Sequence, residues 1–402
     1  MSRRWSVGAL ATCLVLALAA FVPSASGARR HATARATAVP QGFVGMVVDE
    51  PVWPDPFVSL APQLDTMVSA GVQSLRVVFN WSLAQPYPNW KAVPASQRHV
   101  FTNVGGVPTN FAPFDQLVSE AAARGLAVLP TVVAAPRWDG ITRKGALDYV
   151  PRSDGPYAAF VRALARRYGP HGTLWSTTRP AEPIRMWQIW NEPDLRQFWP
   201  LQPFARRYVA LLRAARAAIK SVDPTARIVL GGLTDYSWTD LEQIYAVRGA
   251  RSLFDVVALH PYTRYPRGVV TILSFVRRVM DRNGDRAKPL MADEISWPSS
   301  VGKTNHNVGY DFATTEAGQA RNIARVLPLL ARARASLHLM GFYYYDWAGL
   351  ERPNALAFEF AGLFRLSGGQ FVAKPAYGAF RSGALALEGC RAKGPSAMDC
   401  AR

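Results

Sequence analysis

From residue 41 onward, short apolar stretches alternate with longer stretches in which apolar residues recur at helical spacing. Leu60, Leu64 and Met67, for example, fall on one face of a predicted helix that Gly71 ends. The predicted strands are 43–48, 74–79, 126–133, 184–189, 227–230, 255–259, 289–293 and 337–345. The predicted helices are 57–70, 111–124, 156–168, 203–222, 240–247, 269–282, 316–334 and 375–385. This strict alternation predicts a parallel sheet with right-handed crossovers.

The eight predicted strand–helix units, within residues 41–388, are enough to close a (β/α)8 TIM barrel, so we predict a single-domain α/β protein. The alternative is an open doubly wound sheet, which usually carries a glycine-rich nucleotide-binding turn after its first strand. Here that strand is followed by Asp49-Glu50-Pro51-Val52-Trp53, which cannot cradle a phosphate. The segment after the eighth predicted strand is too short for an accessory β-sandwich.

Residues 1–28 have the composition of a secretory signal peptide. Two arginines precede an apolar run at 7–22, and small residues follow Pro23. An uncleaved membrane anchor is the alternative, because the run is almost long enough to span a bilayer. The break at Pro23 favours cleavage, so we expect a secreted or cell-envelope protein with no stable membrane insertion afterwards. Residues 29–40 are predicted to form a disordered lead-in.

Two cysteines remain outside the signal segment, Cys390 and Cys400, in the C-terminal tail at 389–402. An exported chain meets oxidising conditions, so a local disulfide between them is favoured over two free thiols. Such a bridge would fasten the tail and carry no catalytic meaning.

The chain has a formal net charge of +18, which is compatible with nucleic acid, anionic surfaces or acidic polysaccharides as partners. The basic residues are spread along the chain without a nucleic-acid-binding motif, so we expect no nucleic acid partner. We also expect a monomer.

In a (β/α)8 barrel the loops that follow the strands gather on one face, where the chemistry takes place. Most of the tryptophans fall at or close behind a predicted strand end, together with carboxylates and amides. The residues in these places are Asp49, Glu50, Trp53, Asn80, Trp81, Trp138, Asn191, Glu192, Trp238, His260, Tyr262, Glu294, Trp297, Asp346 and Trp347. Flat aromatic faces stack on sugar rings, although some of these side chains are expected only to cover the barrel.

Two glutamates follow strands that face each other across the barrel mouth. Glu192 lies in Trp190-Asn191-Glu192-Pro193 after the fourth predicted strand, and Glu294 ends the seventh. Cleavage of a glycosidic bond needs a proton donor for the departing oxygen and an anion for the anomeric carbon. Asp293 competes with Glu294 for the second role, and because side chains alternate along a strand, only one of the two should face the mouth.

The Asn-Glu-Pro motif on strand four with a glutamate on strand seven resembles clan A glycoside hydrolases, most closely families 39 and 5. The resemblance implies Glu192 as acid/base and Glu294, rather than Asp293, as nucleophile. It implies that Arg76 holds the nucleophile, that Asn191 binds a substrate hydroxyl and that His260 and Tyr262 form a strand-six pair near it. Trp347 resembles the strand-eight tryptophan beneath the sugar. The missing β-sandwich departs from the xylosidases and iduronidases of family 39.

The predicted site therefore combines the two catalytic glutamates with substrate-binding residues. The predicted substrate-binding residues are Arg76, Asn80, Trp81, Trp138, Asn191, His260, Tyr262, Trp297 and Trp347. No metal or other cofactor is expected, because the histidines are scattered and show no ligand spacing. A serine hydrolase is not expected either, since the Gly-x-Ser-x-Gly elbow is missing.

We thus expect a retaining β-glycoside hydrolase that acts on an oligo- or polysaccharide by double displacement. The alternatives are a non-catalytic carbohydrate-binding barrel, or a transglycosylase that uses the same two glutamates.

Overall fold

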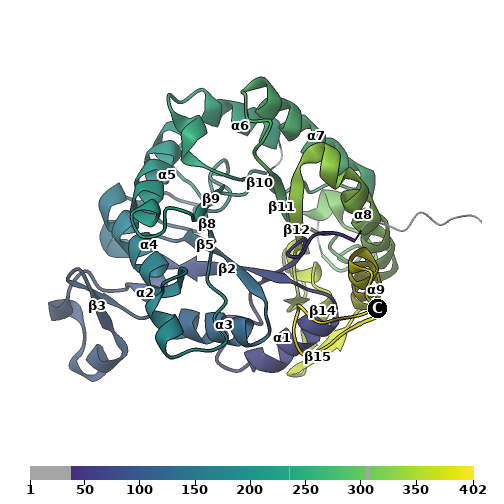
Figure 1. The fold of residues 1–402 in the computed structure, drawn as a ribbon, viewed down its shortest axis with the longest axis horizontal. Coiled ribbons are helices and arrows are strands. Elements are labelled where there is room, and N and C mark those ends of the chain that lie inside the picture. Colours follow the sequence, from purple (N-terminus) through teal and green to yellow (C-terminus); the bar gives the residue numbers. More distant parts are fainter. Residues whose placement is uncertain (1–37, 235, 305–307) are drawn as a thin grey trace, which may run out of the picture. The chain divides into compact units, whose positions relative to one another are not determined.

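The computed structural model describes residues 38–234, 236–304 and 308–402, so the predicted signal peptide lies outside the described residues. Its centre is an eight-stranded parallel sheet in the order β10-β11-β12-β1-β2-β5-β8-β9. Bridges between Val229 and Val256 and between Leu233 and Leu259 join the two ends of the sheet into a ring. Figure 1 looks into this ring and shows the helices outside it. The predicted (β/α)8 barrel is confirmed.

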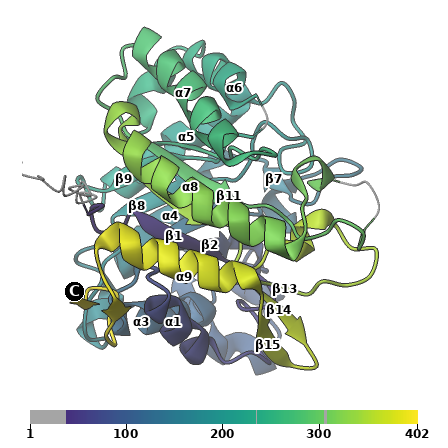
Figure 2. The same cartoon turned by 90° about the vertical axis from the view of Figure 1, so that its right-hand side faces the viewer.

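The barrel strands and the helices that cover them alternate along the chain. The strands are β1 (Val44–Val48), β2 (Ser74–Asn80), β5 (Ala127–Val133), β8 (Met186–Ile189), β9 (Arg227–Leu230), β10 (Val257–Leu259), β11 (Leu290–Ile295) and β12 (Leu339–Tyr344). The covering helices are α1 (Leu60–Ser69), α3 (Ala112–Ala123), α4 (Asp154–Tyr168), α5 (Ala205–Lys220), α6 (Ser237–Tyr245), α7 (Pro266–Arg282), α8 (Glu316–Leu337) and α9 (Pro375–Glu388). Figure 2 shows α8 and α9 side by side along the barrel.

The strands are apolar along their length because both of their faces are covered. All five residues of β1 and all six of β11 are buried, as expected for a parallel sheet with helices on one side and packed side chains on the other. The barrel interior has its own small cluster, which includes Val47, Leu129 and Tyr343. A β-carbon at Gly45 would collide with the ring of Tyr343, so glycine leaves the space that this ring fills.

Short elements are added in the loops that follow three of the barrel strands. After β2 come α2 (Trp81–Ala84), the 3-10 helices η1 (Trp90–Ala92) and η2 (Ala95–Val100), and the hairpin of β3 (Thr102–Val104) and β4 (Val107–Thr109). The hairpin of β6 (Gly140–Ile141) and β7 (Val150–Pro151) follows β5. A three-stranded sheet of β13 (Ala348–Gly349), β14 (Phe364–Ser367) and β15 (Gln370–Ala373) follows β12. Within the described ranges this sheet is far smaller than an accessory β-sandwich.

Both ends of the described chain pack against the barrel. Val39, in the expected lead-in, is buried, and its N–H donates to the carbonyl of Leu387 at 3.0 Å. In the tail, β16 (Ala392–Lys393) pairs with β17 (Cys400–Ala401), and Cys390 is disulfide-bonded to Cys400. Buried Ala397 donates its N–H to the carbonyl of Arg124. The tail is therefore packed on the barrel rather than frayed.

Across the described part of the chain, every helix is too short or too polar to cross a lipid bilayer.

Candidate active site

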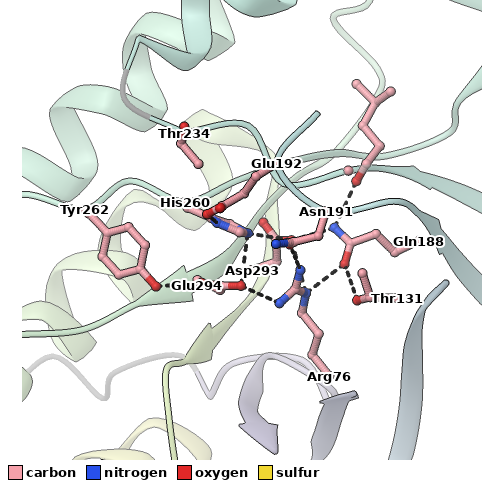
Figure 3. A network of polar contacts seen from close by, with 12 residues as sticks. Arg76, Thr131, Gln188, Asn191, Glu192, Thr234, His260, Tyr262, Asp293 and Glu294 are labelled. Carbon is pink, nitrogen blue, oxygen red and sulfur yellow. Dashed lines mark hydrogen bonds and ion pairs between the residues drawn. The ribbon is translucent and has the colours of Figure 1, made fainter. Parts of the chain in front are cut away.

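The ends of β2, β8, β10 and β11 place a network of polar side chains at one mouth of the barrel (Figure 3). Arg76 comes from β2, and Gln188 from β8. Asn191 and Glu192 directly follow β8, His260 and Tyr262 follow β10, and Asp293 and Glu294 lie in β11. Strand ends that are far apart in the sequence thus meet around two glutamates.

Glu294 is held by two donors. Nη1 of Arg76 donates to Oε1 at 2.6 Å, and the hydroxyl of Tyr262 donates to Oε2 at 2.6 Å. The glutamate is buried except for a small exposed part, which lines a cavity. A guanidinium and a hydroxyl directed at the two oxygens form strong, charge-assisted hydrogen bonds that hold this carboxylate in place.

Arg76 uses all of its guanidinium nitrogens in this network. Nε donates to Oε1 of Gln188 at 2.7 Å, and Nη2 donates to Oδ1 of Asn191 at 2.6 Å. Nε also lies 3.3 Å from Oδ2 of Asp293. Burial would lower the pKa of Arg76, but the charges of Asp293 and Glu294 outweigh it and raise the pKa above its ordinary value. The buried arginine therefore stays charged.

Glu192 has a different environment. It is buried, and its Oε1 lies 2.7 Å from Nδ1 of His260. Burial raises the pKa of Glu192 to about 7, although the hydrogen bond and the charge of His260 lower it, and the charge of Glu294 raises it further. Its backbone has a φ of 45°, a conformation that non-glycine residues adopt rarely and that often marks a functional site.

His260 is surrounded by carboxylates. Its Nδ1 faces Glu192. Its Nε2 lies 3.4 Å from Oδ2 of Asp293 and 3.4 Å from Oε1 of Glu294. Burial would lower the pKa of His260, but the charges of Glu294 and Asp293 raise it well above its ordinary value. Two cations, Arg76 and His260, therefore balance two anions, Asp293 and Glu294. This balance leaves Glu192 as the acid that can stay neutral.

Asp293 lies beneath the site rather than in it. It is fully buried and accepts a 2.5 Å hydrogen bond from Nε2 of Gln188. Burial would raise the pKa of Asp293, but the charges of His260 and Arg76 lower it below its ordinary value. Simple alternation does not describe β11, because its pairing with β12 shifts register between Ala292 and Ile295. Asp293 and its neighbour Glu294 therefore both contact Arg76.

The two glutamates are close together. One carboxylate oxygen of Glu192, one of Glu294 and a ring nitrogen of His260 all lie within 4.8 Å of one another. Donor atoms at this spacing could hold a cation, but both oxygens of Glu294 already accept hydrogen bonds from Arg76 and Tyr262. The geometry fits two carboxyl groups that act on the two atoms of one substrate bond better than it fits a metal centre.

Two cavities meet at Glu192. The Glu294 cavity, about 340 Å³, is lined by Asp49, Asp148, Glu294 and Tyr345, among others. The Arg264 cavity, about 840 Å³, is lined by Arg196, Tyr262, Arg264, Asp311 and Phe312, among others. Glu192, Gln197, Val308 and Phe358 line both cavities. A ligand that spans the two must therefore pass Glu192.

The predicted indoles do not line these cavities. Trp81, Trp297 and Trp347 are fully buried and lie in the core, where their ring nitrogens donate to Gln85, Thr263 and Gln63 respectively. The half-buried Trp138 packs edge-on against Trp81 and donates to the carbonyl of Gln85. None of these four side chains lines either of the two cavities described here, so their contact with a sugar stays a prediction. Asn80 does line the Glu294 cavity, and it also caps α2.

The aromatic walls of the cavities come instead from residues that the sequence reasoning missed, namely Tyr345, Phe198, Phe312 and Phe358. Tyr345 directly follows β12, so the strand-end rule that selected Trp347 could have found it. Phe198 lies in a turn, and Phe312 and Phe358 lie in the short 3-10 helices η6 (Tyr310–Phe312) and η7 (Ala357–Phe360), which are too short to show a periodic pattern.

Gln188 and Gly232 were missed as well. Gln188 lies inside β8 and bridges Arg76 to Asp293. A β-carbon at Gly232 would collide with the ring of His260 and lie 2.8 Å from Oδ2 of Asp293, so only glycine leaves room for this histidine. A Gly-Gly pair at a predicted strand end was the signal available in the sequence.

Solved structures share this architecture. A family 39 glycoside hydrolase from the gut symbiont Bacteroides cellulosilyticus is 19% identical, with a TM-score of 0.59, covering 86% of this chain. This chain spans 63% of that protein, less than two thirds of its length. A monomeric β-xylosidase from Caulobacter crescentus is 18% identical, with a TM-score of 0.62, covering 86% of this chain and 69% of its own. The catalytic domain of a family 53 enzyme from Ignisphaera aggregans is 18% identical, with a TM-score of 0.56, covering 86% of this chain and 97% of its own.

No family model and no curated protein matches the sequence. The resemblance to clan A glycoside hydrolases that the Asn-Glu-Pro motif suggested is confirmed at the level of the fold: the chain has the (β/α)8 barrel of these enzymes.

Proposed function

We propose that the protein is a retaining glycoside hydrolase that cleaves β-linked oligo- or polysaccharides. The observation that carries this proposal is the pairing of Glu192 and Glu294. Their nearest oxygens lie within 4.8 Å; Glu294 accepts hydrogen bonds from a guanidinium and a hydroxyl, whereas burial raises the pKa of Glu192 to about 7. Retaining enzymes separate their carboxyl groups by about 5–5.5 Å, whereas inverting enzymes leave about 6.5–9.5 Å for a water molecule.

In the first step, ionised Glu294 attacks the anomeric carbon while protonated Glu192 transfers its proton to the departing glycosidic oxygen. Glu192 then carries a negative charge, which the nearby His260 stabilises from 2.7 Å. The products of this step are a glycosyl ester on Glu294 and the free leaving group.

In the second step, Glu192 removes a proton from water, and the water oxygen attacks the anomeric carbon and releases Glu294. The structure supports this change of role. The charge of Glu294 is one of the causes that raise the pKa of Glu192. Because ester formation removes that charge, the pKa of Glu192 falls when Glu192 has to act as a base.

The proposal is tested by the stereochemistry of the product. The purified protein is incubated with a panel of aryl β-glycosides and β-linked oligosaccharides, and the first hemiacetal formed is followed by proton NMR. We expect the β-anomer to appear first, before mutarotation. Release of the α-anomer first, or no hydrolysis across the panel, would contradict the proposal. Transfer to added oligosaccharide in preference to water would instead identify a transglycosylase with the same residues.

We also propose that the protein is exported. The composition of residues 1–28 is that of a secretory signal, and a disulfide such as Cys390–Cys400 is typical of oxidising compartments. An extracellular or cell-envelope hydrolase of polymeric carbohydrate is consistent with both features.

A further inference from the structure

The two cavities on either side of Glu192 differ in charge. Besides the catalytic pair, the Glu294 cavity is lined by the carboxyl groups of Asp49 and Asp148. Its guanidinium, from Arg76, is already bound to Glu294 and Asp293. Burial raises the pKa of both Asp49 and Asp148 to about 6, so both are mostly ionised at neutral pH. An anionic sugar would be repelled from this cavity, whereas carboxylates readily accept hydrogen bonds from neutral hydroxyls.

The Arg264 cavity is lined by two arginines of a different kind. Arg196 and Arg264 are exposed, and neither forms an ion pair with another described residue. The guanidinium of Arg264 lies 5.8 Å from the ring centre of Tyr265. Among the described residues that line this cavity, Asp311 is the one acid besides Glu192. The cavity therefore offers two unneutralised cations to whatever enters it.

The proposed mechanism assigns a role to each cavity. The sugar that is attacked must lie over Glu294, and the leaving group must lie beyond the proton donor Glu192, in the Arg264 cavity. We propose that the Arg264 cavity is a leaving-group subsite for a sugar that carries an anionic group, a carboxylate or a sulfate ester, which Arg196 and Arg264 bind. The assignment of this cavity to the leaving group rests on the proposed function, whereas the anion site itself does not.

The chemistry of the cavity fits this ligand. A guanidinium binds a carboxylate or sulfate through paired N–H donors, and such charge-assisted bonds are stronger than neutral ones. The stacked rings of Tyr262 and Phe312, with centres 5.0 Å apart, line the same cavity and offer an apolar surface beside the cations. The net charge of +18 would also attract a polyanionic substrate from a distance. The substrate would then carry a neutral sugar on the attacked side and an acidic one on the leaving side.

The test compares substrates that differ only in charge. β-Linked oligosaccharides with a uronate on the leaving side are compared with their carboxyl-reduced forms and with sulfated counterparts. Each is assayed with the wild type, with the double variant Arg196→Gln/Arg264→Gln, and with the control Arg286→Gln/Arg321→Gln. The control removes the same charge from exposed positions outside both cavities.

We expect the cavity variant to lose roughly 10- to 100-fold in kcat/KM on the acidic substrate, the range for lost bonds to a charged group. Its turnover of a p-nitrophenyl β-glycoside, whose aglycone carries no carboxylate or sulfate, should stay within about twofold of wild type. The control variant should keep both activities. Whether the uronate or the sulfate shows the larger loss identifies the anion. Equal rates on acidic and carboxyl-reduced substrates, or an equal loss in the control, would overturn the proposal.

A binding experiment keeps the outcome separate from catalysis. Calorimetry measures the affinity of the wild type and the cavity variant for an acidic disaccharide and for its carboxyl-reduced form. Arginine-dependent binding of the acidic form supports the anion site even if no glycoside is hydrolysed, in which case the proposed function alone fails. Equal affinities for the two forms would refute the anion site even if hydrolysis is observed.

Discussion

The two glutamates at the barrel mouth are chemically identical but have opposite surroundings. Glu294 receives a guanidinium and a hydroxyl, one on each oxygen. Glu192 is buried with His260 as its neighbour, and its pKa is raised to about 7. The difference produces an anion and an acid a few ångströms apart, which is the arrangement that double displacement requires.

This contrast is made by residues from other strands. The positive charge beside Glu294 belongs to Arg76, which comes from β2. The neighbour of Glu192 is His260, which follows β10. Asp293 beneath them keeps both cations in place through contacts of 3.3 and 3.4 Å. The two glutamates therefore differ in environment because closure of the barrel brings other strands to them, and not because of the local sequence around either one.

The largest effect should come from removing the anion. Glu294→Gln keeps the shape of the side chain but removes the nucleophilic charge, so kcat should fall by about 10⁴- to 10⁶-fold. The rate is measured on an activated aryl β-glycoside, and intact mass is measured with a 2-fluoro glycoside that traps the ester. The wild type should gain the mass of one glycosyl group, and the variant should not.

Glu242→Gln is the matched control, because this glutamate is half exposed and forms a surface ion pair with Arg282. It should retain full activity and the trapped intermediate. A Glu294→Gln enzyme that stays within tenfold of wild type would rule out Glu294 as the nucleophile.

Removal of the acid should cost less and change the pH profile. Glu192→Gln should lower turnover of oligosaccharides by about 10²- to 10⁴-fold, the usual contribution of general acid–base catalysis. Because the protonated form is required, wild-type kcat/KM should decline as the pH rises through about 7. With an aryl glycoside whose leaving group needs no proton, the variant should lack this alkaline decline. An unchanged decline in the variant would assign it to another group.

Arg76 contacts both Glu294 and the buried Asp293. Its replacement should therefore lower the free energy of unfolding as well as the turnover rate. Arg76→Met removes one of the two cations that balance the buried carboxylates Asp293 and Glu294, and breaking a buried pair in this way costs about 3–5 kcal/mol. Urea unfolding measures the change. Arg282→Met, which breaks the exposed pair with Glu242, should cost less than about 1 kcal/mol. Similar losses in the two variants would mean that Arg76 does not anchor the buried network.

Much of this arrangement was predictable, because a strand end in a (β/α)8 barrel sets where a residue lies. Because both faces of the sheet are buried, the strands can be recognised as apolar runs in the sequence. The ends of these runs predicted that Glu192, His260 and Glu294 lie together at one mouth of the barrel. The same rule placed Trp81 and Trp347 near the mouth but not their rings, which lie in the core. The direction of a side chain beyond a strand depends on loop geometry, which follows no residue period.

Two further features lay beyond sequence reasoning for physical reasons. The register shift in β11 brings Asp293 and Glu294 to the same arginine, and side-chain alternation predicts the opposite. The charge contrast between the two cavities depends on Arg196, Arg264 and Asp148, which lie in irregular loops. Loop positions carry no periodic signal, so only the folded structure brings them together.

The smallest expected effect is a shift in the pH profile, and it is the most direct test of whether the two glutamates have separate neighbours. The hydrogen bond and the charge of His260 both lower the pKa of Glu192. His260→Gln removes that charge, so the pKa of Glu192 should rise, and the alkaline decline of kcat/KM should move to higher pH. Tyr262→Phe is the contrast, because it removes a donor to Glu294 alone and should slow turnover by about 10- to 100-fold without moving the decline. If both variants moved the decline equally, the two glutamates would titrate as one unit, and their separate roles could not be assigned to separate neighbours.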